Sequence, residues 1–217
     1  MSKKILAIIG SFCFLGLFLT ACQAETAGPT EEKIYPYGFD TAKVTYEMKG
    51  SITGQKTVYY KGNKSSTETH ASRNNAGVEE KMDMLTIDSG EFIYQIDLNT
   101  LTGTNAKNPV YSELKGLSGA ARAEYLTRIA VGGAPGSTQQ PVSKEQKEIA
   151  GQKCDLYQVA DLGEVCLWSG IPLYTKIELP DAGISNTVTA TAVQINLDVS
   201  DQKFVIPNGI KMQDVSR

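Results

Sequence analysis

The sequence predicts a mainly β protein of the α+β class, built on one curling antiparallel sheet. Three features of its 217 residues support this prediction. Short segments of alternating apolar and polar residues recur about every ten residues, which is typical of an antiparallel meander. Clusters of glycine, asparagine and aspartate separate these segments and supply turns. The apolar phase of segment 187–199 shifts near residue 192, which predicts a β-bulge of the kind that helps a sheet curl.

Residues 1–21 have the layout of an export signal. Two lysines precede an apolar run from Ile5 to about Leu19, which is too short for a comfortable membrane span. The run ends in Leu-Thr-Ala-Cys at 19–22, which resembles the bacterial lipobox. This resemblance implies cleavage before Cys22 and acylation of Cys22; the alternatives are an ordinary signal and an uncleaved anchor. Several acyl chains on one residue bind a bilayer stably, so we expect the membrane as a partner.

The residue after Cys22 bears on the protein's location. It is Gln23, and by resemblance to the enterobacterial sorting rule the lack of aspartate there implies the outer membrane, with the protein facing the periplasm. In a Gram-positive cell the same signal implies the cell surface. Residues 22–38 are polar and contain prolines, so they predict a lipidated tether, and 39–217 then form a single domain.

Charge and composition exclude several classes of function. Loss of residues 1–21 removes two lysines and no acid, so the formal net charge falls from −3 to −5. An acidic chain cannot neutralise many phosphates, which excludes a basic nucleic-acid binder. The single histidine excludes most multi-histidine metal sites, and we expect no metal and no cofactor.

The first half of the domain contains strand patterns of period two. In the earliest of them Val44, Tyr46 and Met48 alternate with polar residues, and Gly54 marks the centre of the turn that follows. The predicted strands lie at 44–49, 57–60, 67–72, 78–87 and 92–98.

One helix is predicted at 118–130. Ser118 is a suitable N-cap, and Glu124 and Arg128 form an i,i+4 pair on the polar side. A glycine-rich connector at 132–136 ends the helix, which suits either a lid or a plain packing helix. The predicted narrow apolar face comprises Ala120, Ala123, Leu126, Ile129 and Ala130.

The second half returns to strands and holds the two cysteines that remain in the domain. Cys154 shares a face with Leu156, and Cys166 shares a face with Trp168 on the return strand. In an oxidising compartment a disulfide between Cys154 and Cys166 is the expected outcome; the alternatives are a redox-active pair and a metal site. If the two cysteines lie directly opposite each other, the turn between their strands is centred on residue 160. The position of Gly163 instead favours a turn centred near residue 162. Further strands are predicted at 171–179, 187–199 and from 204, where a last turn ends at 209.

A resemblance to a known family rests on the segment Ile149–Leu173, IAGQKCDLYQVADLGEVCLWSGIPL. The segment Phe204–Gly209 and the opening at 39–62 are similar too. The chain resembles an uncharacterised family of bacterial envelope proteins related to the LolA/LolB lipoprotein-carrier superfamily. This resemblance implies a strongly curved, half-open antiparallel barrel with helices that close its mouth over an apolar cavity. It also implies a protein that carries or senses lipidic ligands in the periplasm, but it transfers no individual ligand residue.

Aromatic and methionine side chains supply the candidate cavity. Methionine adapts to irregular ligands, and aromatic walls suit acyl chains. The alternative is that these residues are ordinary core. The candidate ligand cavity comprises Tyr46, Met48, Tyr60, Met82, Met84, Phe92, Tyr94 and Trp168.

Catalytic motifs are nearly absent, so we expect no enzyme. Gly116–Ala120 is a near-miss to the nucleophile elbow, and Ser118 is explained as a helix cap. His70 lies in a polar stretch that predicts a solvated side chain. Our hypothesis is an outer-membrane-anchored periplasmic lipoprotein that binds an apolar or lipid-like ligand as carrier or sensor. The alternative is a filled-barrel structural lipoprotein that contacts a protein partner in an envelope assembly, and a hydrolase using Ser118 is a third.

Overall fold

The computed structural model describes residues 32–215, except 36, 76, 133–141 and 160–161. The chain divides into two units, Met1–Glu32 and Lys33–Arg217, and all described helices and strands lie in the second. The predicted signal at 1–21, Cys22 and most of the predicted tether lie outside the described residues. None of the described helices is long and apolar enough to cross a membrane.

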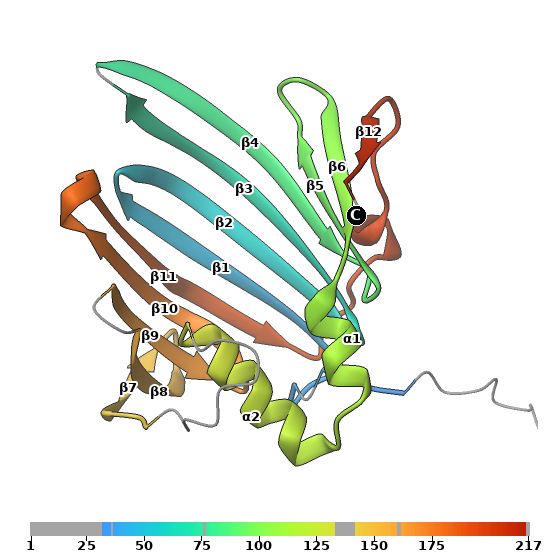
Figure 1. The fold of residues 1–217 in the computed structure, drawn as a ribbon, viewed down its shortest axis with the longest axis vertical. Helices are drawn as coiled ribbons and strands as arrows, with labels where there is room; N and C mark the ends of the chain where they lie inside the picture. Colours follow the sequence, from blue (N-terminus) through green and yellow to red (C-terminus); the bar gives the residue numbers. More distant parts are fainter. Residues whose placement is uncertain (1–31, 36, 76, 133–141, 160–161, 216–217) are drawn as a thin grey trace, which may run out of the picture. The chain divides into compact units, whose positions relative to one another are not determined.

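The unit Lys33–Arg217 is built on one curved, open sheet of twelve strands (Figure 1). The strand order is β12-β6-β5-β4-β3-β2-β1-β11-β10-β9-β8-β7, and every neighbouring pair is antiparallel except β12 with β6. The prediction of a mainly β fold with a curved antiparallel sheet is therefore confirmed. The strands are β1 (Thr41–Gly50), β2 (Ile52–Lys61), β3 (Lys64–Asn75), β4 (Val78–Asp88), β5 (Phe92–Asp97), β6 (Thr102–Lys107), β7 (Glu145–Ile149), β8 (Gln152–Val159), β9 (Gly163–Trp168), β10 (Ile171–Leu179), β11 (Ile184–Ile195) and β12 (Lys211–Asp214).

The first hairpin turns earlier than the sequence predicted. Met48 pairs with Gly54, so the turn is centred on Ser51 and Gly54 lies within β2. Gly54 has φ 150°, and a Cβ there would lie 2.3 Å from the carbonyl oxygen of His70 on β3. The glycine signal thus marks a close approach of two strands rather than a turn.

The bulge that the phase shift predicted is present in β11. Ala192 pairs with Thr45 and Ala190 pairs with Tyr46, so Thr191 is the extra residue. The last strand was wrongly predicted: Phe204 ends a short 3₁₀-helix, η2 (Asp201–Phe204), and the strand β12 begins at Lys211.

Two helices follow β6, and only the second was predicted. The missed helix α1 (Pro109–Lys115) begins with Asn108, whose side chain accepts a hydrogen bond from the Tyr111 N–H as an N-cap. Helix α2 (Gly119–Ala130) buries Arg122 and Tyr125, whereas Ala120 and Ala123 of the predicted apolar face are exposed. Arg122 is buried because its guanidinium donates to the carbonyls of Leu114 and Lys33, at 2.9 and 3.0 Å.

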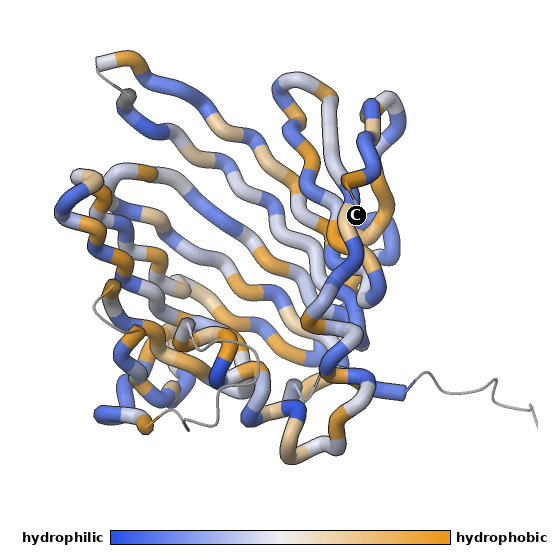
Figure 2. Tube along the Cα trace, in the orientation of Figure 1, coloured by the Kyte–Doolittle hydropathy of each residue, from blue (hydrophilic) through white to orange (hydrophobic). Residues whose placement is uncertain are grey.

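The sheet has an apolar core on each of its two faces, and Figure 2 shows apolar and polar residues alternating along its long strands. We call the face that carries Tyr46 and Tyr60 the inner face; its core also contains residues of β8, β9 and β10. The opposite, outer face carries a smaller core of Leu85, Ile87 and Ile96, covered by the C-terminal segment 206–212. Because side chains alternate between the two faces along each strand, one part of the sheet contributes core residues to its inner face and another part contributes them to its outer face.

Candidate functional site on the inner face of the sheet

The register shows which predicted cavity residues share a face. Tyr46 pairs with Lys56, Lys56 with Thr69, and Thr69 with Met84, so these four side chains form one row on the inner face. The next row toward the hairpin tips comprises Met48, Gly54, Ala71 and Met82. Five predicted cavity residues, Tyr46, Met48, Tyr60, Met82 and Met84, therefore lie on the inner face.

Two predicted cavity residues lie on the other face. Ile87 belongs to the outer-face core, and Tyr94 is its cross-strand partner on β5. Tyr94 therefore lies on the outer face, where it packs against the core under the C-terminal segment. Phe92 is two residues from Tyr94 on the same strand, and the two rings contact at 6.4 Å between centroids. The sheet itself separates both rings from the inner face, so they cannot line the same cavity as Tyr46.

The base of the inner face, where β1 begins, is filled by the chain's own N-terminal segment. The rings of Tyr35, Tyr37 and Phe39 stack in succession, with centroids 5.4 and 5.5 Å apart. Phe39 then stacks on Trp168 at 5.5 Å, and Tyr37 meets Tyr60 edge to face at 5.2 Å. Residues Lys33–Phe39 are named the ring segment here. Within the predicted tether, Tyr35 and Tyr37 thus pack on the domain.

The ring segment is fixed by polar contacts as well. The backbone N–H of Ile34 donates to Oδ1 of Asn63 at 2.7 Å. The hydroxyl of Tyr35 donates to Asp88 at 3.0 Å, and Nδ2 of Asn108 donates to the same carboxylate at 3.1 Å. Burial raises the pKa of Asp88, although these hydrogen bonds and one from the Gly90 N–H oppose the shift. This network joins the ring segment to β4 and to the start of α1.

The middle of the inner face holds a lysine among apolar groups. Nζ of Lys56 lies 4.4 Å from the ring centroid of Tyr46, which is a cation–π contact. Burial lowers the pKa of Lys56 and raises the pKa of Tyr46, whose hydroxyl also hydrogen-bonds Tyr60. Met48, Met82 and Met84 around this position are half-buried, unlike Tyr46 at 2% exposure. This part of the face is therefore only partly covered.

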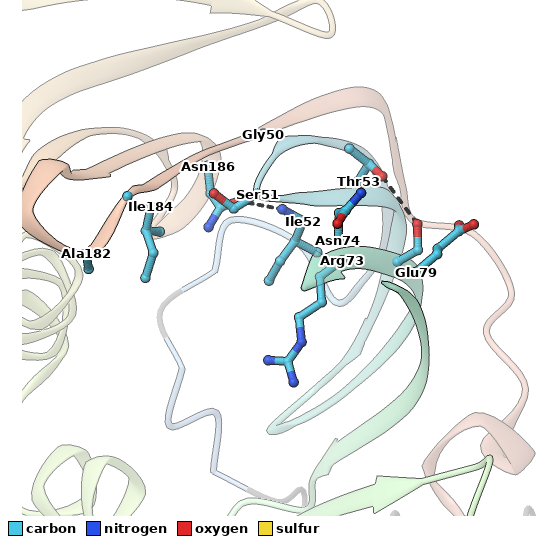
Figure 3. Close-up of a pocket in the computed structure, with 12 residues that line it drawn as sticks. Gly50, Ser51, Ile52, Thr53, Arg73, Asn74, Glu79, Ala182, Ile184 and Asn186 are labelled. Atoms are coloured by element: carbon cyan, nitrogen blue, oxygen red, sulfur yellow. Dashed lines mark hydrogen bonds between the residues drawn. The ribbon is translucent and has the colours of Figure 1, made fainter. Parts of the chain in front are cut away.

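A hollow lies at the far end, between the hairpin tips (Figure 3). Its volume is about 710 Å³, and it is lined by residues of three hairpins, including Ile52, Arg73 and Ile184. Figure 3 shows the Arg73 side chain extending away from its strand, and its Nε donates to Glu80 at 2.7 Å. Sequence analysis missed this hollow, because hairpin tips far apart in the sequence form it.

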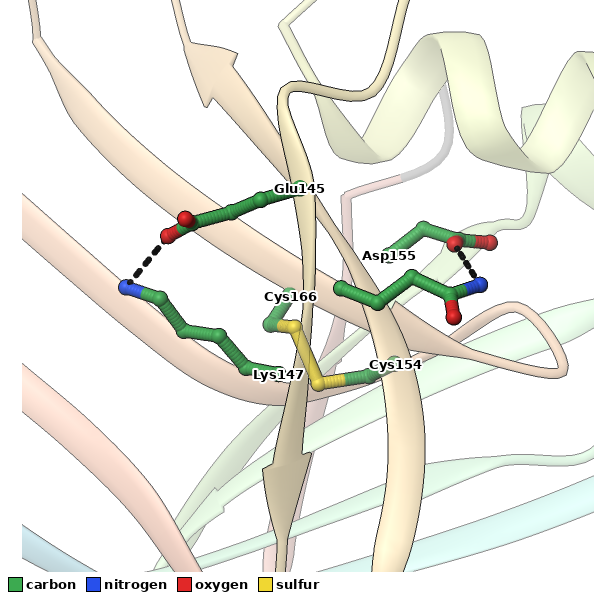
Figure 4. The surroundings of a disulfide bond; sticks show 6 residues. Glu145, Lys147, Cys154, Asp155 and Cys166 are labelled. Atoms are coloured by element: carbon green, nitrogen blue, oxygen red, sulfur yellow. Dashed lines mark hydrogen bonds and ion pairs between the residues drawn. A yellow bond between two sulfur atoms is a disulfide. The ribbon is translucent and has the colours of Figure 1, made fainter.

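The two cysteines form the predicted disulfide (Figure 4). Leu156 pairs with Cys166, so the strand register lies midway between the two that the cysteine and glycine signals predicted. Cys154 lies diagonally across from Cys166, with Cα atoms 5.4 Å apart. Both cysteines are almost fully buried in the inner core beside Leu156. An ion pair between Glu145 and Lys147 on β7 lies beside the disulfide. The disulfide itself links β8 to β9 near one edge of the sheet.

The residues considered for chemistry are dispersed. Ser118 is the N-cap residue of α2, and its side chain makes no capping hydrogen bond. His70 is exposed, and its Nδ1 lies 2.9 Å from Oδ1 of Asp83 on the outer face. Within the described part of the chain, no three histidine, cysteine, aspartate or glutamate residues gather as a metal site would require.

Several solved structures align with most of this chain at low sequence identity. A conserved protein described as uncharacterized, from Thermus thermophilus, aligns with a TM-score of 0.50 and 8% identity over 84% of this chain and 94% of its own. PNGF-II aligns with a TM-score of 0.47 and 14% identity, over 82% of this chain and 32% of its own. MucB of Pseudomonas aeruginosa, solved in complex with MucA, aligns with a TM-score of 0.39 and 9% identity, over 77% and 56%. No protein-family model and no curated protein matches the sequence.

Proposed function

We propose that this chain is an envelope lipoprotein that binds an apolar or lipid-like molecule on the inner face of its sheet. It acts as a carrier or sensor and performs no covalent chemistry. The LolA/LolB resemblance of segment Ile149–Leu173 and the lipobox at Cys22 support this proposal. Cys22 anchors the protein to the outer membrane on its periplasmic side, and the ring segment begins at Lys33, eleven residues after Cys22 in the sequence.

One observation carries the proposal. The base of the inner face is covered by the stacked rings of Tyr35, Tyr37 and Phe39, whereas Met48, Met82 and Met84 farther along the same face are half-buried. Partly exposed methionines on a concave apolar surface are adaptable contacts for an acyl chain. The described residues thus cover only in part the region of the inner face that suits such a ligand.

The filled base favours a second candidate function, an interaction lipoprotein of an envelope assembly. In that case the ring segment completes the core and the remaining surface contacts a protein. The two functions differ in whether the free chain binds a small apolar molecule.

The test introduces a charge on either face of one strand. Met82 lies on the inner face of β4 and Lys81 is its exposed neighbour on the outer face. Titration with the apolar dye N-phenylnaphthylamine should show binding by the wild type, about tenfold weaker binding by Met82→Glu, and unchanged binding by Lys81→Glu. Thermal unfolding of each variant confirms that it is folded. A folded wild type that does not bind the dye would support the interaction lipoprotein instead.

A further inference from the structure

We propose that the ligand of the inner face is a fatty acid, whose carboxylate is held by Lys56 and Thr69 and whose chain runs toward the hairpin tips. This inference rests on the proposed function and names the ligand class for that site. It follows from the position of one lysine, the residue opposite it, and the shape of the surface on each side.

Lys56 is a cation without a counter-charge in an apolar setting. Among the residues that the structure describes, no carboxylate lies within salt-bridge distance of its Nζ, whereas Arg73 nearer the hairpin tips is paired with Glu80. Its row on the inner face contains Tyr46, Thr69 and Met84 before the next charged side chain, Asp97 on β5. Lys56 is half-buried, and partial removal of a cation from water costs stability unless it is compensated, so this position fits an anionic ligand group.

Charges facing this row do not replace such a ligand. Asp97 already accepts hydrogen bonds from the backbone N–H groups of Asn99 and Thr100, at 2.8 and 3.2 Å. Asp88, at the base, is held by Tyr35 and Asn108. Neither carboxylate lies within salt-bridge distance of Lys56, so its ammonium group is available to an anionic ligand.

Thr69 supplies a second donor beside the lysine. It lies directly opposite Lys56 across the β2–β3 pair, where facing Cβ atoms are about 5 Å apart. One ammonium and one hydroxyl at this spacing match the two oxygens of a carboxylate. A single unpaired cation also matches the single negative charge of a fatty acid.

We place the acyl chain on the side of Lys56 that faces the hairpin tips. Toward the base, Tyr60 and the ring segment close the inner face. Toward the hairpin tips the next row contains Met48, Met82, Gly54 and Ala71, and the last two carry at most a methyl group on this face. From Lys56 to Ile52 the strand extends about 13 Å before the hollow at the tips begins.

The experiment compares dodecanoate with its uncharged alcohol, dodecanol, by calorimetric titration of the soluble chain that begins at Gln23. This form keeps the whole compact unit Lys33–Arg217 and lacks the anchor's own acyl chains. Lys56→Gln removes the charge. The matched control is Lys43→Gln, because Lys43 also lies over a tyrosine ring, that of Tyr59, but on the outer face.

We expect dodecanoate to bind the wild type more tightly than dodecanol. Lys56→Gln should weaken dodecanoate binding about tenfold and leave dodecanol binding unchanged, and Lys43→Gln should change neither. Equal binding of dodecanoate by the wild type and Lys56→Gln would overturn the fatty-acid assignment and leave the proposed function intact. Binding of neither molecule by the folded wild type would overturn both.

Discussion

The ring of Phe39 stacks on the ring of Trp168, with centroids 5.5 Å apart and planes 18° apart. This contact joins the N-terminal ring segment to β9, the strand that carries Cys166.

Phe39→Ala should lower the free energy of unfolding by about 3–5 kcal/mol, since Phe39 is 6% exposed and its removal leaves a cavity. Urea unfolding measures the change. The control Val78→Ala removes an exposed side chain and should change stability little; an equally small effect of Phe39→Ala would show that the ring segment is not part of the core.

Removal of the disulfide should destabilise the domain without changing its fold. The bridge between Cys154 and Cys166 spans a separation of 12 residues, and its loss restores conformational freedom to the unfolded chain. The double variant Cys154→Ala/Cys166→Ala should lose about 2–4 kcal/mol of unfolding free energy. The wild type in reductant should show a similar loss, and resistance of its unfolding midpoint to reduction would argue against the bridge.

Titration of Asp88 should contribute to the change of unfolding free energy with pH. Because burial raises its native pKa above the usual 3.8, the folded state favours the protonated form. Stability from this group is therefore fully present below about pH 4 and is lost as the pH rises through the native pKa. Urea unfolding from about pH 4 to 7 should show the stability of the wild type falling relative to Asp88→Asn.

Asp97 provides a control of opposite sign. Backbone N–H donors from Asn99 and Thr100 lower its pKa, so its contribution is present above the usual pKa and is lost as the pH falls. Asp97→Asn should therefore remove a component that disappears in acid. If the wild type gained stability relative to Asp88→Asn as the pH rose, the inferred burial effect on Asp88 would be wrong.

The proposed anchor makes a separate prediction. Cys22→Ser should abolish incorporation of a labelled fatty acid into the chain and shift the protein from the detergent phase to the aqueous phase on partitioning. Cys13→Ser lies inside the predicted signal and should leave both unchanged. Continued labelling of the Cys22→Ser variant would remove the lipobox assignment.

The sequence was informative where structure is local. Period-two alternation located most strands, and the phase shift near 192 located the bulge at Thr191, because both follow from the pleat. Helix α1 had a local signal as well: Asn108 before Pro109 is a typical N-cap with proline at the first helical position. The sequence analysis did not use that signal.

Features set by long-range packing were not predictable in this way. Alternation showed that Tyr94 and Tyr46 each point to one face, but only the register through β2, β3 and β4 shows that the faces differ. The buried face of α2 was missed because Arg122 is held by carbonyls from Leu114 and Lys33, which no helical periodicity reveals. The lack of a carboxylate partner for Lys56 among the described residues likewise depends on its neighbours in three strands.

Mass spectrometry of organic extracts tests the central claim most directly. The chain beginning at Gln23 would be exported, so that Cys154 and Cys166 can oxidise, and purified without detergent beside Met82→Glu and an unrelated exported protein. We predict about one acyl-chain amphiphile per wild-type chain, much less in Met82→Glu and none in the unrelated protein. An extract free of lipid, from a folded wild type that also leaves N-phenylnaphthylamine unbound, would contradict a ligand-binding role for the inner face.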